Sequence, residues 1–386
     1  MTRRTLLHRA KLIAGVTAVA AAGGLSYRAY DRGVLSAGEG SAFDAWDTWS
    51  AERGPRALVA GAILAASPHN TQPWRYRLAP GRIDVLADRT RSLNAADPLD
   101  RELEIGLGCA LENLALTATA NGLRPRISVA GRGDQVARVA LARGLPWRSP
   151  LYSAIPDRRT NRYPFEDGRP VTARHRGAMA ALAAGLPGTS VIWFADPEPR
   201  RAIRRTLIDA TEAFVADEDQ SRAAFSWFRQ DWEGFMRRRD GLNVDTAGLP
   251  DVVTAMAKLL PPQSRQASDR AWISATRDRQ AATAAAFGVI TVRDARSTVD
   301  RVRGGRLLQR LHLWATANGL AFQHMNQVTE RVDRERQLGI TPVFTRAAAE
   351  LVGPGSGEWL AAFRIGHPTR GSRRSPRRSV EQVVAP

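Results

Sequence analysis

The stretch from Ser67 to Trp74 reads S-P-H-N-T-Q-P-W and places two amide side chains between two prolines. An amide offers both donors and acceptors, and burying it costs free energy unless those atoms find partners. The prolines restrict the backbone before any ligand arrives. The stretch therefore predicts a loop that binds a planar, polar ligand such as a heteroaromatic ring. The alternative is a helix-exit loop anchored by Trp74.

A second stretch, Ile155 to Phe165, has the residue types that bind an anion. It reads I-P-D-R-R-T-N-R-Y-P-F. Arginine donates bidentate hydrogen bonds to phosphate. Alternate residues of an extended segment share a face, so Arg158, Thr160 and Arg162 should point the same way, with Arg159 facing away from them. The alternative is a solvated basic surface.

The elements that must position these residues alternate between helices and short strands. Pro55 is well placed at a helix start and Gly122 at a helix end. Alternating apolar and polar residues favour strands. Helices are expected over 43–53, 55–66, 100–121 and 172–184, and strands over 75–78, 82–87, 126–129, 136–141, 190–195 and 359–365.

The chain contains an internal similarity whose two copies are separated by about half its length. Residues 111–123 read L-E-N-L-A-L-T-A-T-A-N-G-L, and residues 308–320 read L-Q-R-L-H-L-W-A-T-A-N-G-L. The last six positions are identical, and Gly122 and Gly319 are 197 residues apart. Helical composition alone rarely produces such a match. It therefore predicts an internal duplication whose unit is a domain and not a solenoid repeat.

The Ser67–Trp74 stretch resembles the S-x-x-N-x-Q-P-W loop of the nitroreductase family of FMN-binding flavoproteins, where the loop lies against the flavin of a dimer-interface site. The Ile155–Phe165 segment resembles the R-x-S-x-R segment that holds the FMN phosphate in that family. The tail pair Arg377-Arg378, followed by S-V-E, resembles the family's basic pair before L-E-E-V. The length resembles the long, Acg-like branch. The resemblance runs from about Phe43 onward and is weakest over 200–303.

The resemblance implies an α+β, nitroreductase-like fold with two related halves in one chain, forming a pseudo-dimer. The first half would span 37–150. The second would span 151–386, with an insertion over about 200–303 and a tail that binds the FMN phosphate. Each half carries a segment that the other lacks, so one FMN site would be complete and one vestigial. A fused pseudo-dimer needs no partner chain, and a monomer is expected.

The implied cofactor contacts come from both halves. The first-half loop would line the flavin ring and ribityl chain, and the second-half segment and the tail would bind the phosphate. Backbone within A-F-Q-H-M-N-Q would approach the reactive edge of the flavin. The implied residues are Ser67, Pro68, His69, Asn70, Gln72, Arg158, Thr160, Arg162, Met325, Asn326, Arg377 and Arg378. Trp74 is expected beneath the loop, and a disordered Ser/Arg tail is the alternative for the last two arginines.

The insertion carries aromatic residues at helical spacing, among them Trp227, Phe228, Trp232 and Phe235. These residues predict either a core stripe or a lid that contacts substrate. Because the first half has no counterpart, the insertion is expected to cover the vestigial site.

The implied activity is FMN-dependent reduction of a small electrophile, such as a nitro compound or quinone, with NAD(P)H. No glycine-rich dinucleotide fingerprint, Ser-His-Asp arrangement or CxxC metal motif occurs, and the single cysteine, Cys109, lies in an apolar helical run. Flavin-borne chemistry needs no catalytic side chain of those kinds. The alternatives are an FMN-binding or storage protein without turnover, and a basic nucleic-acid or envelope-binding protein.

The net charge of the chain indicates which ligands it favours, and its amino-terminal segment indicates where in the cell it is located. The net charge is +18, mostly from arginines scattered among acidic residues, which favours anionic ligands without a nucleic-acid-binding motif. Arg3-Arg4 before the mildly apolar run Leu12–Leu25 resembles a twin-arginine export signal. Residues 1–36 are therefore interpreted as a signal or anchor, with export to the periplasm or cell envelope and membrane contact only through this segment. A cytoplasmic protein is the alternative.

Overall fold

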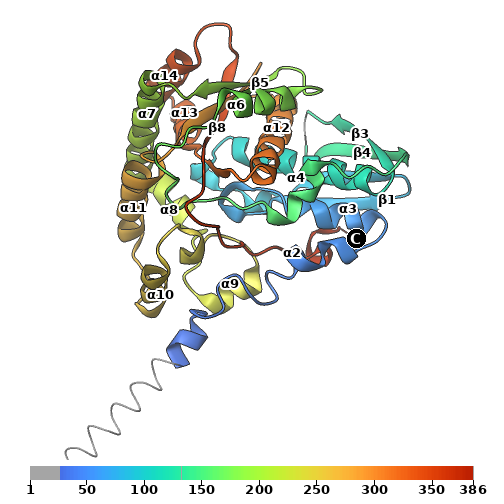
Figure 1. Ribbon diagram of the computed structural model, residues 1–386, viewed down its shortest axis with the longest axis horizontal. Helices are drawn as coiled ribbons and strands as arrows, with labels where there is room; N and C mark the ends of the chain where they lie inside the picture. The colour runs from blue at the N-terminus through green and yellow to red at the C-terminus, as the bar shows by residue number, and fades with distance from the viewer. Residues whose placement is uncertain (1–26, 132, 386) are drawn as a thin grey trace, which may run out of the picture.

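The computed structural model describes residues 27–131 and 133–385. The export-signal prediction falls largely on residues 1–26, outside the described part. The described chain forms two four-stranded antiparallel sheets with two long helices, α4 and α12, between them (Figure 1). The α+β class predicted from the sequence is confirmed. Among the described residues, no helix is both long enough and apolar enough to cross a membrane.

The first half builds its sheet around helix α4 (Arg101–Ala120). Its strands are β1 (Trp74–Ala79), β2 (Arg82–Ala87), β3 (Leu123–Val129) and β4 (Gln135–Arg143), and they lie in the order β1-β2-β4-β3. Short helices α2 (Ala45–Thr48), η1 (Trp49–Ala51) and α3 (Pro55–Ala62) precede the sheet. Three single turns, η2 (Pro68–Asn70), η3 (Arg89–Arg91) and η4 (Asn94–Ala96), connect these elements.

The second half repeats this arrangement around helix α12 (Thr298–Ala317). Its strands β5 (Thr189–Phe194), β6 (Ala286–Val292), β7 (Ala321–His324) and β8 (Glu358–Gly366) lie in the equivalent order β5-β6-β8-β7. Both central helices have 20 residues, and their first residues, 101 and 298, are 197 apart. The remaining elements at its start are α5 (Pro150–Ser153), η5 (Ile155–Asp157), α6 (Ala173–Ala180) and η6 (Ala181–Ala183). Helices α13 (Gln327–Leu338) and α14 (Val343–Val352) separate β7 from β8.

The insertion has different boundaries from those predicted. Residues between β5 and β6 form α7 (Pro197–Ala216), α8 (Glu218–Phe225), α9 (Trp232–Arg238), η7 (Val244–Thr246), α10 (Asp251–Leu259), α11 (Arg265–Ser274) and the π-helix η8 (Ala275–Gln280). The predicted end at residue 303 is wrong, because 286–292 form β6 and 298–303 begin α12. These two elements occupy the places of β2 and α4. A sequence match confined to 308–320 could not show this.

The carboxyl-terminal tail leaves the second half and packs on the first. Its last helix is α15 (Val380–Val383). Val384 forms a parallel bridge with Tyr76 of β1, and the backbone N–H of Ala385 donates to the Tyr76 carbonyl at 2.7 Å. The Ser379–Gln382 capping box starts α15. The Ser/Arg-rich segment is therefore an ordered connection between the halves, and the alternative of a disordered tail is not what the structure has.

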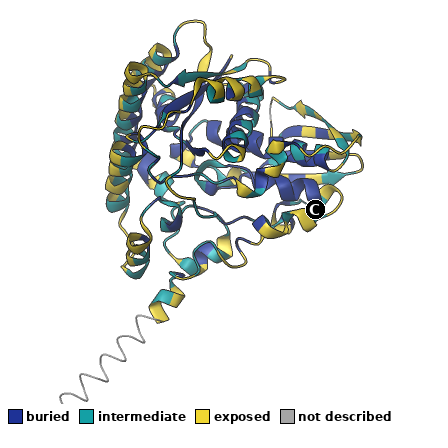
Figure 2. Cartoon of the chain, viewed as in Figure 1, coloured by how far each residue is buried: buried dark blue, intermediate teal, exposed yellow. Residues whose placement is uncertain are grey.

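The two halves meet where α4 and α12 cross, at the centre of the buried core (Figure 2). Gly108 and Gly305, again 197 residues apart, stand at this crossing. A Cβ atom on Gly108 would collide with the Val302 carbonyl, and one on Gly305 would collide with the Ile105 carbonyl. The thiol of Cys109 donates to the Gly305 carbonyl at 3.2 Å, so Cys109 is a buried packing residue. The absence of side chains here lets the helix backbones touch.

Polar contacts fix the register of this crossing. Gln309 donates through its side-chain amide to the Asn113 side chain at 2.8 Å, and both residues are fully buried. Glu112 accepts from Arg306 at 2.7 Å and from Arg310 at 2.6 Å. Truncating one side of such a pair leaves a buried group unsatisfied, so the contacts select one alignment of the halves.

We expect Gly305→Ala to destabilise the protein. The new methyl group meets backbone atoms of α4, which cannot move without displacing the first half, and overpacking of this kind costs about 1–3 kcal/mol. Chemical unfolding of the purified variant measures the loss. Gly177→Ala in α6 is the matched control, because a Cβ there meets nothing within 4 Å. Equal stability of the two variants would contradict the close contact.

Candidate functional site

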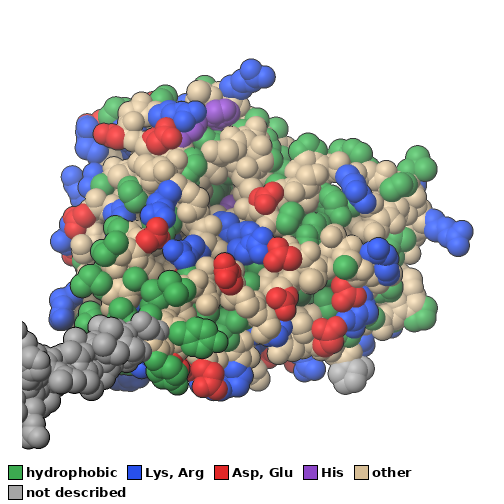
Figure 3. Space-filling model, turned by 60° about the horizontal axis from the view of Figure 1, so that its bottom comes forward, with side chains coloured by type: hydrophobic (Ala, Val, Ile, Leu, Met, Phe, Trp, Pro, Cys, Tyr) green, Lys and Arg blue, Asp and Glu red, His purple; other side chains and the backbone are tan. Residues whose placement is uncertain are grey.

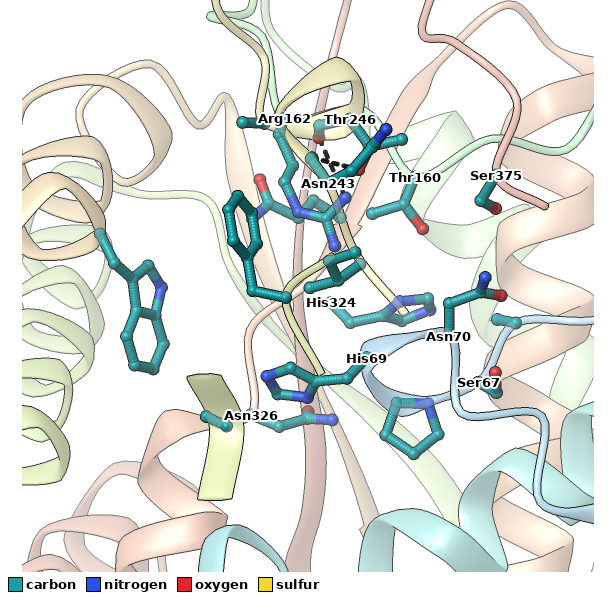
Figure 4. A pocket seen from close by; sticks show the side chains of 18 of the residues that line it. Ser67, His69, Asn70, Thr160, Arg162, Asn243, Thr246, His324, Asn326 and Ser375 are labelled. Carbon is teal, nitrogen blue, oxygen red and sulfur yellow. Dashed lines mark hydrogen bonds between the residues drawn. The ribbon is translucent and has the colours of Figure 1, made fainter. Parts of the chain in front are cut away.

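A cavity of about 360 Å³ lies where the two halves, the insertion and the tail meet. The first-half loop contributes Ser67 to Asn70, and the second-half segment contributes Arg158, Arg159, Thr160 and Arg162. Helix α4, residues 323–330, the insertion and the tail complete the wall. Figure 4 shows His69, His324 and the Arg162 side chain directed toward the same space. Segments separated by more than 300 residues in sequence therefore form one site.

The first-half loop is held in an unusual backbone conformation. His69, Asn70 and Gln72 have φ angles of 44°, 55° and 53°. Positive φ is uncommon for residues other than glycine, and such conformations concentrate at functional sites. Gly106 of α4 makes room beneath the loop, since a Cβ there would lie 3.0 Å from the Pro68 ring. The loop thus presents His69 and Asn70 to the cavity at a conformational cost.

Contacts with the insertion and the tail hold the loop. The Asn70 side-chain amide donates to the Gly241 carbonyl at 3.3 Å and to the Pro376 carbonyl at 3.1 Å. Its oxygen accepts from the Arg377 guanidinium at 2.6 Å. Both polar atoms of the Asn70 side chain therefore join the loop to distant parts of the chain.

The second-half segment is anchored to its own sheet. Thr160 forms a parallel bridge with Phe322 of β7, and the Asn161 N–H donates to the Phe322 carbonyl at 2.9 Å. The fully buried Arg364 of β8 donates to the Asn161 and Tyr163 carbonyls at 3.2 and 2.8 Å. These contacts make the segment extended, as predicted, and direct Thr160 and Arg162 into the cavity.

Three arginines surround the Trp46 ring at one end of the cavity. The guanidinium carbons of Arg159, Arg377 and Arg158 lie 4.0, 4.7 and 5.9 Å from its ring centroid. Trp46 is itself fixed by a 2.8 Å hydrogen bond from its indole N–H to the Ser375 carbonyl. A cation over an aromatic face is attracted by the ring quadrupole. We refer to Arg158, Arg159 and Arg377 as the Trp46 arginine cluster.

The cluster carries positive charge that is buried without an acidic partner among the described residues. Arg158 donates to the Leu64 carbonyl at 3.2 and 3.3 Å, Arg159 to the Arg158 carbonyl at 2.7 Å, and Arg377 to neutral oxygens. Burial lowers the pKa of Arg158 to about 10. Burial, then repulsion by neighbouring arginines, lowers the pKa of Arg159 to about 9 and that of Arg377 well below its ordinary value. An anion bound in the cavity would compensate the buried positive charge and reduce the repulsion between these arginines.

The same positive field keeps the cavity histidines neutral. Burial and then the Arg162 charge lower the pKa of His69 to about 4. Burial, then Arg158 and Arg162, lower the pKa of His324 to about 3, and its Nε2 atom has no hydrogen-bond partner in the structure. Arg162 donates to the Thr246 carbonyl at 3.2 Å, and burial lowers its own pKa to about 10. Neutral imidazoles can offer one donor and one acceptor to a ligand.

The opposite wall carries two buried carboxyl groups. Glu102 stands in the first turn of α4, and Glu330 in the first turn of α13. Both side chains line the cavity, together with Asn326 and Gln327. Burial, followed by the nearby Asp97, raises the pKa of Glu102 to about 8, and burial with Glu102 raises that of Glu330 well above its ordinary range.

The insertion closes the cavity on the remaining side. Phe225 and Phe228 follow from α8, Trp272 comes from α11, and Ala275 and Arg279 come from the π-helix η8. π-helical turns are rare and occur frequently at functional sites. The insertion was predicted to cover a vestigial site. It instead covers the cavity that the Ser67–Asn70 loop lines. Figure 3 shows one face of the molecule, with Lys and Arg side chains beside a hollow near the middle of that face.

Nine of the predicted site residues line the cavity. They are Ser67, Pro68, His69, Asn70, Arg158, Thr160, Arg162, Asn326 and Arg377. Trp74 lies buried outside the cavity lining, as expected from the sequence.

Three predicted site residues do not line the cavity. The Gln72 side chain joins the Arg239 carbonyl at 2.7 Å to the Arg378 N–H at 2.8 Å. The Arg378 guanidinium turns outward to the Gln72 and Gln382 carbonyls, at 3.3 and 2.6 Å. Met325 packs in the apolar cluster with Phe287. Gln72 and Arg378 therefore fasten the tail to the loop, and Met325 is a core residue.

Several cavity residues were not identified from the sequence. Arg159 was expected to face away, yet it lines the cavity because Trp46 draws its guanidinium inward. His324 lies within A-F-Q-H-M-N-Q, from which only Met325 and Asn326 were predicted as site residues, and Glu330 gave no local motif. Other cavity residues that were not predicted include Glu102, Arg279, Arg373 and Ser375. For Arg373 and Ser375, the only signal in the sequence is the S-R-R-S pattern at residues 372–375, just before the predicted pair Arg377-Arg378.

Comparison with known proteins gives partial relatives only. Over 134 residues, 33% of this chain, the sequence is 31% identical to a Mycobacterium tuberculosis protein named as a candidate NAD(P)H nitroreductase, in two strains. The match spans 39% of the length of those curated relatives. No family model matches the sequence.

Solved structures give loose superpositions. An FMN-dependent nitroreductase of Mycobacterium smegmatis in complex with NADPH covers 61% of this chain and 97% of its own, at 13% identity and a TM-score of 0.36. A nitroreductase with bound FMN from Desulfitobacterium hafniense covers 60% of this chain and 95% of its own, at 17% identity and a TM-score of 0.33.

We expect inorganic phosphate to stabilise the ligand-free protein. An anion bound near the Trp46 arginine cluster relieves buried charge repulsion, and a ligand at about 100 times its Kd adds about 2.7 kcal/mol. Thermal unfolding in phosphate, compared with chloride at equal ionic strength, measures the effect. Arg159→Gln should remove most of it. Arg374→Gln should keep it, because Arg374 pairs with Asp47 at 2.7 Å outside the cavity. Loss of the effect in both variants would contradict a localised anion site.

Proposed function

We propose that this protein is an FMN-dependent oxidoreductase of nitroreductase type that reduces a small electrophile, such as a nitro compound or quinone, with NAD(P)H. The observation that carries the proposal is the meeting of three segments at one cavity. The Ser67–Asn70 loop, the Arg158–Arg162 segment and the tail at Arg377 come from different halves, and each resembles an FMN-binding segment of that family. The partial M. tuberculosis relative supports the same proposal.

The charge of the cavity fits the phosphate of FMN. The Trp46 arginine cluster is buried, and no carboxylate is paired with it within residues 27–131 and 133–385. The Arg377 Nε atom has no partner in the structure. Thr160 and Ser375 add hydroxyl groups to the same lining. Burying cations is costly without a counter-ion, so a dianionic phosphate is the group these residues are suited to hold.

The remaining lining fits a planar heteroaromatic ring. Buried polar atoms without partners stand around the cavity, and a ring edge with donors and acceptors would pair with them. They are His324 Nε2, Asn243 Oδ1, Gln327 Oε1 and Arg279 Nε. Apolar groups such as Ile105, Leu308 and Phe228 supply surfaces for the ring faces. Bound FMN would supply hydride or electron transfer, and the chain would supply position and charge.

The duplication and the assembly belong to the same proposal. We infer that the two halves descend from one nitroreductase-like subunit, as in an Acg-like branch, because their strand order and their central helices repeat. One chain then supplies both sides of one FMN site, which favours a monomer. The twin-arginine-type export remains part of the proposal, and export after folding would suit a protein that already holds its cofactor.

A second candidate function is FMN binding without turnover. The insertion favours it, because Phe225, Phe228 and Trp272 line the cavity and reduce the room left for a nicotinamide. Anaerobic mixing of the FMN-loaded protein with NADH or NADPH separates the two. Bleaching of the oxidised flavin bands supports the oxidoreductase. Flavin that stays oxidised with both reductants, yet is reduced by dithionite, supports the binding protein.

We expect the purified protein to bind one FMN per chain, with oxidised-flavin absorption bands. Asn70→Ala in the first half and Arg162→Gln in the second should each weaken FMN binding about 10- to 100-fold, because hydrogen bonds to charged groups are worth about 1.5–3 kcal/mol. Fluorescence titration with FMN measures both. Arg374→Gln is the control and should bind normally. If either cavity variant kept the wild-type affinity, the two halves would not share one cofactor.

A further inference from the structure

We propose that Glu102 and Glu330 form a proton-sharing carboxyl pair that delivers a proton to the substrate reduced in this cavity. The inference rests on the proposed function and deepens it. The pair would be a catalytic acid of the chain itself, distinct from the groups that hold the cofactor. Its substrates would be electrophiles whose reduction leaves a negative charge on oxygen, of which a quinone is the simplest.

The geometry brings the two carboxyl groups together at the cavity wall. Glu102 comes from α4 of the first half and Glu330 from α13 of the second, and their side chains are within hydrogen-bonding reach of each other. The residues are 5% and 7% exposed, and both line the cavity. Glu102 Oε1 and Glu330 Oε2 are buried without a partner among the groups described. The pair therefore has two buried oxygen atoms with unused hydrogen-bonding capacity beside the cavity.

Two carboxylates cannot approach in a buried site unless a proton or a cation neutralises one of them. The nearest cation, Arg101, is already committed to Asp333 of α13, at 2.7 and 2.5 Å, and to the Trp359 carbonyl at 2.9 Å. The other charged group facing the pair is Asp97, which accepts from the Leu103 N–H at 2.9 Å and adds negative charge. Asn326 contributes a neutral amide. Protons bound by the carboxyl groups themselves are what remain to neutralise the pair.

Burial and nearby negative charge support a protonated state at neutral pH. Burial and then the Asp97 charge raise the pKa of Glu102 to about 8, and burial and then the Glu102 charge raise the pKa of Glu330 well above its ordinary range. Asp97, whose pKa burial raises to about 7, strengthens the effect. A general acid works best when its pKa lies near the operating pH. The cavity histidines cannot serve, because their pKa values of about 4 and about 3 leave them neutral.

The proton step balances for a quinone. A quinone that has gained one hydride, two electrons and one proton, is a hydroquinone monoanion. The pair enters the step with a proton on each carboxyl group. One of its two O–H bonds breaks and an O–H bond to the substrate oxygen forms, which yields the neutral hydroquinone and leaves the pair as a monoanion in which the two carboxyl groups share the remaining proton. Water returns the proton to the pair before the next turnover. The nicotinamide of the proposed activity is the ultimate reductant.

The purely structural reading is that the pair only links α4 to α13. Glu102→Gln and Glu330→Gln test this, since each keeps the shape and removes the transferable proton. Glu335→Gln is the matched control. Glu335 is a buried glutamate of the same helix that accepts from the Phe344 and Thr345 N–H groups outside the cavity. It should lose stability without changing the proton readouts below.

The first readout needs no cofactor. Infrared spectra of the ligand-free protein at pH 7 should contain a carboxylic-acid C=O band that weakens in Glu102→Gln and Glu330→Gln but persists in Glu335→Gln. Because the folded state holds protons that the unfolded state has released, stability should fall as pH rises from the ordinary glutamate range to about 8. Both cavity variants should flatten that fall. A wild-type protein without such a band would overturn the proposal.

The second readout is the reoxidation of pre-reduced, FMN-loaded protein by a quinone in single-turnover experiments. Wild-type rates should stay constant to about pH 8 and then decline. Each cavity variant should be slower by about 10²-fold or more, since general acids contribute 10²–10⁴-fold. FMN affinity should be unchanged. If the variants keep the wild-type rate and pH profile, the carboxyl pair is not the proton donor, and the proposed function stands. If the wild-type protein binds no FMN, the proposed function is wrong as well.

Discussion

The contact of α4 with α12 at Gly108 and Gly305 is the constraint on which the rest of the molecule depends. With no Cβ atom on either glycine, the two helix backbones meet directly, and the polar pair of Asn113 and Gln309 fixes their alignment. A small displacement of α12 would carry Glu330 and the Arg158–Arg162 segment away from the first-half loop. The cavity is therefore a consequence of how two halves pack, and neither half contains it alone.

Packing the halves this way concentrates positive charge where little of it can be compensated by the chain. Elsewhere in the described structure, arginines such as Arg101 and Arg334 have carboxylate partners. Around Trp46 they have carbonyls, an amide and an aromatic face instead. A protein gains no stability by burying cations in this manner. The arrangement is understandable if the missing negative charge belongs to a ligand.

Many of the helices and strands, and part of the cavity lining, could be predicted from the sequence. The remaining features depend on contacts between residues that are far apart in the sequence. The loop Ser67–Trp74, the repeat around Gly122 and Gly319, and the strand patterns are local, and local patterns predicted the elements well. Trp46 lies 329 residues from Ser375 and 331 residues from Arg377, and Arg377 lies 307 residues from Asn70. No local pattern reveals that these residues meet. The strand β6 was absorbed into the predicted insertion because its counterpart β2 shares a fold position and no visible sequence.

The two ends of the cavity are electrically opposite in kind. At the Trp46 end, buried arginines lie close together and an anion would compensate their charge. At the Glu102 end, two carboxyl groups lie close together and bound protons neutralise them. A ligand with a dianionic group at one end and a reducible group at the other satisfies both requirements at once. His69 and His324 also line the cavity and are neutral, so they add no charge to either end. This separation lets the cavity bind strongly through one end and keep an acid at the other, which is what a reduction that consumes both electrons and a proton requires.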